Sequence, residues 1–285
     1  MTMSPWTNPS PPRPDQIDLA QPVNFSHPQA RGLVAYYPLW LGKSPIHSGL
    51  DRSFGRYPLV PTNGPTVGAD GTFGRAVRFT SASVQSMQLG AAVVSSMPFS
   101  AFGWFRMNTV NSQQSLISLV RSDAFHCWMM YYQNTSSILR LNCTAGQGTD
   151  DTLSGSLPVP STGWFHGGMI CRSATNRQLY VNGIGDNIGT VSRSPSGVNR
   201  TSLGVWGGNW APIGVHVPFN GFAGEYRFYN RALTDAEVYN LWHPGRRWGM
   251  LRTLTGRRVF TVQAAAATFK PYWIPRTNKR IGAFA

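Results

Sequence analysis

Hydrophobic and polar residues alternate along much of the chain in short runs that end at Gly, Asn, Ser or Pro. In chain order these runs include "RGLVAYYPLW", "AVRFT", "FSAFGWFRM", "SLISLV", "FHCWMMYY", "ILRLNC", "WFHGGMIC", "RQLYVNGIG", "TSLGVW" and "GEYRFYN". A period of two is typical of strands with one buried face, so about ten such runs predict two antiparallel sheets packed face to face. Within "LYVNGIG", Asn182-Gly183 predicts a two-residue type I′ hairpin turn.

One short helix is predicted after the last of these strands, in "LTDAEVYNLWHPG". Thr234 and Glu237 have the spacing of a capping box, in which the hydroxyl accepts from the amide of Glu237 and the carboxylate accepts from the amide of Thr234. Pro244-Gly245 ends the helix. We interpret this helix as a structural cap that closes the sandwich.

The composition fits one large all-β domain with terminal arms. Of the 285 residues, 12% are aromatic and only 13% are charged. No apolar run reaches the roughly 18 residues of a membrane span, and the N-terminus has no signal-peptide pattern, so we expect folding in the cytosol of the producing cell. Cys127, Cys143 and Cys171 are odd in number and lack CxxC spacing, which predicts buried thiols rather than disulfides or a zinc site.

Both ends of the chain differ from its middle. Seven prolines in residues 1–31 predict an extended N-terminal arm, followed by the folded domain at 32–245 and a basic C-terminal arm at 246–285. The net charge is +14, and nine basic residues but no acidic one follow Glu237. We expect this arm to dock on an acidic neighbouring subunit; single-stranded nucleic acid is the less favoured partner, because no nucleic-acid-binding module is present. The expected contact residues are Arg246, Arg247, Arg252, Arg257, Arg258, Tyr272, Trp273, Arg276 and Arg280.

Residues 32–243 resemble a known family. The pieces "GLVAYYPL", "SGLDRSFGRYPLV", "FGRAVRFT", "FSAFGWFRM", "RQLYVNGI" and "YNRALTDAEV", in this order, are similar to the laminin-G-like branch of the concanavalin A-like jelly rolls. The resemblance implies an all-β jelly-roll sandwich of two antiparallel sheets with one short C-terminal capping helix. Some relatives bind calcium through carboxylates near the sheet rim; because the carboxylates here are scattered, we assign no metal ligand and expect no cofactor. They are Asp51, Asp70, Asp123, Asp150, Asp151 and Asp186.

The layout of the arms suggests a narrower resemblance. A Pro-rich arm, the junction "HPGRRWGML" and the terminal "PYWIPRTNKRIG" look like parts of virion proteins of tailed bacteriophages. This implies a homo-oligomeric structural protein of the virion, assembled in the host cytoplasm, whose partners are the major capsid protein or neighbouring copies. Capsid decoration is the preferred role.

We expect no enzymatic activity. Glycoside hydrolysis needs two carboxyl groups at a defined separation. The chain has two glutamates, Glu225 and Glu237. Glu237 belongs to the capping box, and no second carboxylate lies near Glu225 at strand spacing.

The alternative function is a carbohydrate-binding module or a tail or fibre adhesin. Trp206, Trp210 and His216 lie in the Gly- and Pro-rich loop "LGVWGGNWAPIGVHVPFNG". Exposed rings in such a rim loop would stack on the C–H faces of host surface glycans. Alternatively, the same rings fill the end of the core or a subunit contact.

Overall fold

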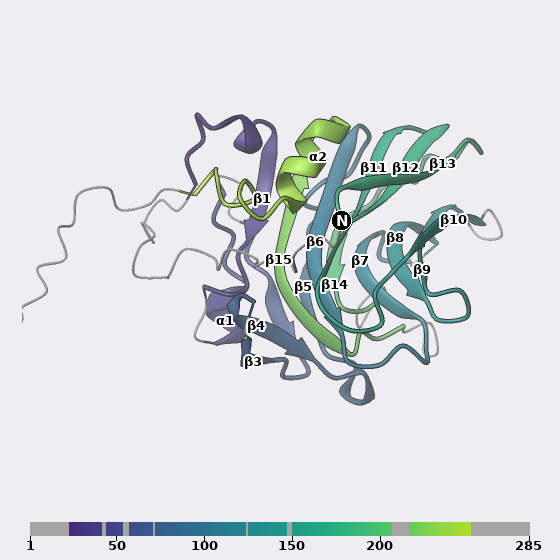
Figure 1. The fold of residues 1–285 in the computed structure, drawn as a ribbon. Helices are drawn as coiled ribbons and strands as arrows, with labels where there is room; N and C mark the ends of the chain where they lie inside the picture. Colours follow the sequence, from purple (N-terminus) through teal and green to yellow (C-terminus); the bar gives the residue numbers. More distant parts are fainter. Residues whose placement is uncertain are drawn as a thin grey trace, which may run out of the picture. The chain divides into compact units, whose positions relative to one another are not determined.

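Two antiparallel sheets packed face to face make up most of the described chain (Figure 1), which confirms the sandwich predicted from the alternation. The computed structural model describes residues 23–41, 44–53, 57–70, 72–123, 125–146, 150–206 and 217–251. All of them belong to one folded unit, Met1–Thr253.

The first sheet contains eight of the described strands. Seven follow one another across the sheet, and β1 (Leu33–Tyr37) pairs with β15 beside them. In spatial order the seven are β13 (Ile184–Gly189), β12 (Asn176–Val181), β11 (Phe165–Ser173), β6 (Phe99–Met107), β15 (Gly221–Tyr229), β4 (Gly74–Phe79) and β3 (Thr66–Asp70).

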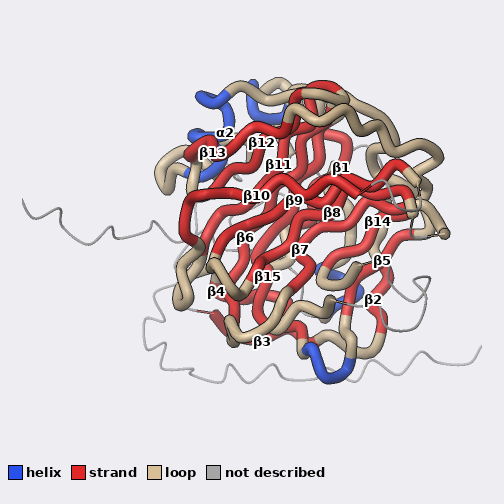
Figure 2. Tube along the Cα trace, turned by 90° about the vertical axis from the view of Figure 1, so that its right-hand side faces the viewer, coloured by secondary structure: helices blue, strands red, loops and turns tan. Residues whose placement is uncertain are grey.

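The second sheet contains seven of the described strands, and it faces the viewer in Figure 2. Its neighbouring strands all pair antiparallel. Its spatial order is β10 (Asp150–Pro158), β9 (Ile138–Ala145), β8 (His126–Gln133), β7 (Gln114–Val120), β14 (Arg200–Leu203), β5 (Ser86–Leu89) and β2 (Val60–Thr62).

Strand β8 shows how the alternating pattern produces the core. Trp128, Met130 and Tyr132 point into the space between the sheets, whereas Met129 and Tyr131 point outward. Met129 and Tyr131 are buried as well, at 4% and 7% exposure, so both faces of this strand are covered. The three cysteines are buried free thiols, as predicted.

The turn between β12 and β13 is the predicted two-residue hairpin. Val181 pairs with Ile184, so Asn182 and Gly183 alone connect the strands. Their φ angles are 51° and 79°, the left-handed values that a type I′ turn requires. Gly183 lies against Trp242, where an added Cβ would be 3.0 Å from the indole ring.

Helix α2 (Asp235–Trp242) packs on the outer face of the eight-stranded sheet. Its N-terminus carries the predicted capping box: the Glu237 amide donates to Thr234 Oγ1 at 3.3 Å, and the Thr234 amide donates to Glu237 Oε2 at 2.9 Å. The Glu237 carboxylate also accepts from both terminal nitrogens of Arg231. None of the helices in the described residues is long and apolar enough to cross a membrane. The shorter helical segments are η2 (Pro28–Ala30), α1 (Pro45–Ser48) and η3 (Ser81–Ser83).

The first and last described segments lie side by side on that same outer face. Val23 forms an antiparallel bridge with Leu251, and the Asn24 amide donates to the Met250 carbonyl at 2.7 Å. Val23, Met250 and Leu251 are buried in the apolar cluster that covers the sheet. The packed domain therefore extends beyond the expected boundaries at 32 and 245, because apolar residues on both flanks complete its outer layer.

Candidate functional site

A row of mainly polar side chains crosses the outer face of the seven-stranded sheet. Strand pairing places Ser202 opposite both Gln88 and Ser118. Met129 lies opposite Ser118 and Asn142. Directly opposed residues on neighbouring strands share a face, and Met129 belongs to an outer cluster rather than to the core. The whole row therefore points away from the eight-stranded sheet and the core.

A parallel row runs beside it and reaches a residue of the predicted rim loop. Tyr131 lies opposite both Ser115 and Arg140. Trp206 packs on the outer cluster that contains Met129 and Tyr131. We call the two rows, together with Ser86 and Trp206, the polar face. Its members are Ser86, Gln88, Ser115, Ser118, Met129, Tyr131, Arg140, Asn142, Ser202 and Trp206.

Three polar atoms of the polar face are buried without a hydrogen-bond partner in the part of the chain that the structure describes: Ser202 Oγ, Trp206 Nε1 and Arg140 Nε. An unsatisfied buried group of this kind costs about 1–3 kcal/mol, and water or a ligand usually completes it. The described residues hold further such atoms away from the polar face, among them Trp40 Nε1, Trp128 Nε1 and Tyr229 Oη. Ser202 and Tyr131 are buried, at 0% and 7% exposure, whereas Arg140, Asn142 and Trp206 are partly exposed. A ligand would therefore reach the polar face first at these three partly exposed residues.

The electrostatics of the polar face suit hydrogen bonding rather than acid–base chemistry. Among the ten residues of the polar face, Arg140 alone carries a charge. Asp150, on the edge strand β10, accepts a hydrogen bond from Thr144 Oγ1 at 2.7 Å. Burial raises the pKa of the neighbouring Cys127 thiol to about 12, so this thiol is neutral at physiological pH. Hydroxyl and amide groups that both donate and accept match the hydroxyls of a neutral sugar.

On the opposite side of the sandwich, the eight-stranded sheet buries an ion pair. Arg227 Nη2 lies 2.9 Å from Glu225 Oε1, and Tyr36 donates to Glu225 Oε2 at 3.2 Å. Glu225 and Arg227 are each 1% exposed. Burial, together with the Glu225 carboxylate, raises the pKa of Tyr36 well above its usual value. Glu225 is therefore a structural ion-pair partner inside the protein, not a carboxylate that lines a cleft.

Arg247 lies beside this ion pair, in a cage of aromatic rings. Its guanidinium carbon is 4.7 Å from the ring centre of Trp248, 4.8 Å from that of Trp104 and 5.3 Å from that of Phe73. Burial lowers the pKa of Arg247 to about 10, so it stays charged at neutral pH. Arg247, expected in the C-terminal arm that docks on a neighbouring subunit, instead packs inside this domain, where the rings replace solvent around a side chain with 0% exposure.

The structure does not bring the other predicted site residues together. Arg246 is exposed and donates to Asn240 Oδ1 at 2.9 Å. Thr234 and Glu237 form the helix cap, on the other side of the sandwich from Trp206. The remaining predicted residues lie outside the described residues: Trp210, His216, Arg252, Arg257, Arg258, Tyr272, Trp273, Arg276 and Arg280.

Three of the carboxylates considered for calcium are occupied by protein donors. Asp51 accepts three backbone N–H groups. Asp186 accepts three backbone N–H groups and one hydroxyl. Asp70 accepts two backbone N–H groups and an indole N–H, and it pairs with Arg106. Within the described segments, no three His, Cys, Asp or Glu side chains gather as metal ligands.

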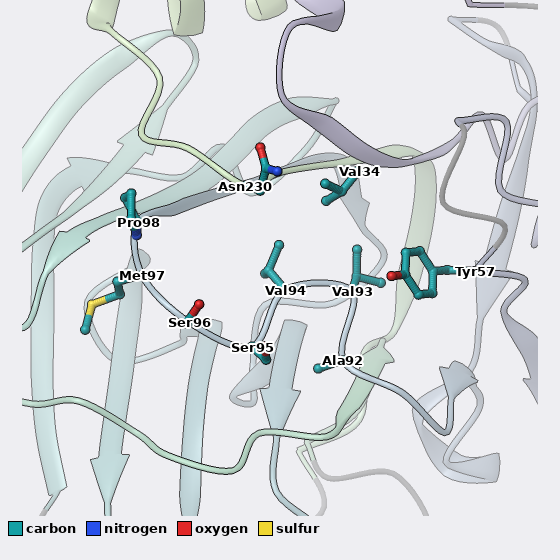
Figure 3. A pocket seen from close by; sticks show the side chains of 10 residues that line it. All are labelled: Val34, Tyr57, Ala92, Val93, Val94, Ser95, Ser96, Met97, Pro98 and Asn230. Atoms are coloured by element: carbon teal, nitrogen blue, oxygen red, sulfur yellow. The ribbon is translucent and has the colours of Figure 1, made fainter.

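A pocket of about 350 Å³ opens elsewhere, where β1 meets the segment that leads into β6 (Figure 3). Val34, Val93 and Val94 form an apolar part of its wall, and Tyr57 and Asn230 contribute polar atoms. This volume is at the lower end of small-molecule sites. None of the residues predicted as functional from the sequence lines this pocket.

The model of the concanavalin A-like lectin/glucanases superfamily matches residues 81–239, more than half of the chain. This chain belongs to that superfamily. The two antiparallel sheets are accordingly its jelly roll, as the family resemblance implied. No curated protein sequence matches the chain.

Solved structures with this jelly roll include domain 4 of AbnA, a GH43 extracellular arabinanase from Geobacillus stearothermophilus, in complex with arabinotriose. The two share 24% identity over 74% of this chain and 98% of that domain, with a TM-score of 0.57. The binding domain of Paraclostridial Mosquitocidal Protein 1 shares 16% identity over 75% of this chain and 52% of that one, with a TM-score of 0.57. A structure of botulinum neurotoxin type C, whose cell entry depends on two ganglioside molecules, shares 12% identity over 68% of this chain and 47% of the toxin chain, with a TM-score of 0.51. The chain thus spans about half the length of the last two.

Proposed function

We propose that this jelly roll is a non-enzymatic carbohydrate-binding domain, and that its polar face binds a neutral oligosaccharide. The observation that carries the proposal is the group of three unpartnered buried atoms, Ser202 Oγ, Trp206 Nε1 and Arg140 Nε, on one outer sheet face. Sugar hydroxyls would complete these hydrogen bonds, and a sugar C–H face would stack on the partly exposed ring of Trp206.

The similar structures support this choice of ligand class. One is a domain solved with arabinotriose, and another belongs to a toxin whose cell entry depends on gangliosides. Both proteins are thus linked to glycans. We infer the same class of ligand for this chain, with the sugar left to experiment.

The absence of catalysis is part of the proposal. Retaining and inverting glycosidases use two carboxyl groups that flank the scissile bond. Here Glu225 is buried against Arg227 and Tyr36, and Glu237 binds Arg231 and the helix cap. The polar face has no glutamate or aspartate among its members. Incubation with the glycan that binds should therefore release no reducing sugar.

A glycan array, followed by calorimetry with the strongest neutral hit, tests the binding proposal. Trp206→Phe keeps an apolar ring but removes the indole N–H, and Arg140→Gln removes the guanidinium. Each is expected to weaken binding by about ten-fold, as for the loss of one hydrogen bond in a dry site. Asn230→Ala, at the edge pocket, is the matched control and should leave the affinity unchanged. An array without neutral hits, or equal loss in the control, would contradict the proposal.

A second proposal concerns the terminal arms. We propose that they tie the domain to a larger assembly, a phage particle being the favoured case, so that the polar face is presented outward. The pairing of Val23 with Leu251 favours this proposal, because it brings both ends of the described domain together on the face opposite to the polar face. Light scattering of the full chain beside residues 23–251 tests this. An oligomer that dissociates when the arms are removed supports it; monomers in both cases, together with no binding to a shell, would contradict it.

A further inference from the structure

Arginine and aromatic side chains alternate across one end of the outer face of the eight-stranded sheet. Phe222 on β15 lies opposite Arg78 on β4 and also opposite Arg106 on β6. Trp164, just before β11, extends the row, because the guanidinium carbon of Arg106 is 5.6 Å from its ring centre. We call Arg78, Phe222, Arg106 and Trp164 the basic row. It uses a different sheet and different residues from the polar face.

The basic row is held in place by contacts within it. The guanidinium carbons of Arg106 and Arg78 lie 4.4 Å and 6.0 Å from the centre of the Phe222 ring. Asp70, whose side chain is 0% exposed, pairs with Arg106 at 2.9 Å and accepts from Trp164 Nε1 at 3.1 Å. A surface that is ordered before binding loses less conformational entropy when a ligand arrives.

The charges of the row are not balanced. Asp70 is shared between Arg106 and Trp164, and Arg78 is exposed with no ion-pair partner among the described residues. We infer that the basic row binds an acidic polysaccharide built from uronate sugars. The planar guanidinium of Arg78 matches a carboxylate in a bidentate arrangement. The rings of Phe222 and Trp164 match the C–H faces of the sugar rings.

Calorimetry of the full chain with a hexameric oligogalacturonate tests this inference. Its carboxyl-reduced counterpart, in which every carboxylate is a neutral alcohol, is the matched ligand. We expect binding of the uronate only, weakening as salt rises. Arg78→Gln should reduce the affinity about ten-fold. Arg75→Gln removes the same charge from the same strand, but Arg75 and Arg78 are three positions apart and so do not share a strand face. The Arg75→Gln variant should therefore bind the uronate with nearly unchanged affinity.

Three outcomes would overturn the inference: equal losses in Arg75→Gln and Arg78→Gln, equal binding of the carboxyl-reduced ligand, or tighter binding of oligothymidylate than of the uronate. Phe222→Leu keeps the apolar volume and removes the aromatic face, so a folded variant with unchanged affinity would also overturn it. Arg140→Gln distinguishes the two sites. It should weaken binding of neutral glycan at the polar face and leave uronate binding intact.

Discussion

The backbone amide of Asn24 donates a 2.7 Å hydrogen bond to the carbonyl of Met250, although the two residues are separated by nearly the whole domain in sequence. The chain therefore enters and leaves the described domain at adjacent points. Both points belong to the layer that covers the eight-stranded sheet, whereas the polar face is on the other sheet. Attachment through the termini would therefore leave the side of the domain that carries the polar face free of the attachment.

Arg247 is expected to hold the C-terminal segment in this layer. Arg247→Ala removes a buried guanidinium from three aromatic rings and leaves a cavity, so we expect a loss of about 2–4 kcal/mol in the free energy of unfolding. Urea denaturation measures this. Arg246→Ala is the matched control, because Arg246 is exposed, and it should cost less than about 0.5 kcal/mol. Equal effects of the two substitutions would show that the cage contributes nothing.

Stability should depend on Glu237 in an acidic pH window. Hydrogen bonds from Arg231 hold the pKa of Glu237 at about 2, below the usual 4.5. A folded-state pKa below the unfolded one stabilises the protein above pH 4.5, and this stabilisation is lost as the pH falls from 4.5 towards 2. Glu237→Gln should be less stable than the natural chain at pH 7 and equally stable near pH 2, measured by chemical denaturation.

Thr234→Ala serves as the comparison for this effect. It removes the capping hydroxyl but leaves the pair between Arg231 and Glu237, so a cost of about 1 kcal/mol is expected at neutral pH. Its pH dependence should follow that of the natural chain. A Glu237→Gln variant whose deficit stays constant from pH 7 to pH 2 would contradict the account of this ion pair.

A second pH effect arises from His166. Burial, together with the charges of Arg227 and Arg247, lowers the pKa of His166 well below 6.5. Because the unfolded chain takes up this proton more readily, stability should fall as the pH drops below 6.5, by up to about 1.4 kcal/mol per pH unit. His166→Phe, which keeps a ring against Phe102, should flatten the slope of unfolding free energy between pH 6.5 and 5. An unchanged slope would mean that His166 titrates normally.

Gly183 is expected to be intolerant of a side chain for two separate reasons. Its φ of 79° strains any residue with a Cβ, and Trp242 lies 3.0 Å from the position that this atom would take. Gly64→Ala is the control, since Gly64 has a φ of 67° and open space around it. We expect Gly64→Ala to cost about 1–2 kcal/mol and Gly183→Ala to cost more, as measured by thermal unfolding. Equal costs would show that Trp242 moves aside freely.

The sequence predicted the strands that are rich in apolar residues and missed those with few of them. "FSAFGWFRM" coincides with β6, whereas β10 reads "DDTLSGSLP" and β3 reads "TVGAD". These strands carry few apolar side chains because they are edge strands of their sheets, so little in their own residues indicates burial. The boundaries at 32 and 245 were too narrow for a similar reason: Val23 and Leu251 gain their burial from residues distant in sequence.

The candidate site was predictable only in part. Trp206 was visible from the sequence as an aromatic residue in a Gly-rich loop. Ser202 and Arg140 were not, because a serine or arginine in a strand is ordinary until strand pairing places it next to particular neighbours. Alternation indicates that Arg140 and Asn142 share a face, but it does not show that Met129 and Ser118 lie across from them. Arg247 was assigned to the arm because it follows Pro244-Gly245 and belongs to the run of basic residues expected to contact an acidic subunit, and only the three surrounding rings explain its burial.

Methyl NMR of the full chain during titration with the neutral glycan tests the central claim most directly. Met129 lies on the polar face, its neighbour Met130 points into the core, and Met97 lines the edge pocket. The account predicts a saturating shift of the Met129 methyl signal, with Met130 and Met97 nearly unmoved. A shift of Met97 with Met129 unchanged would place the ligand in the edge pocket and contradict the account.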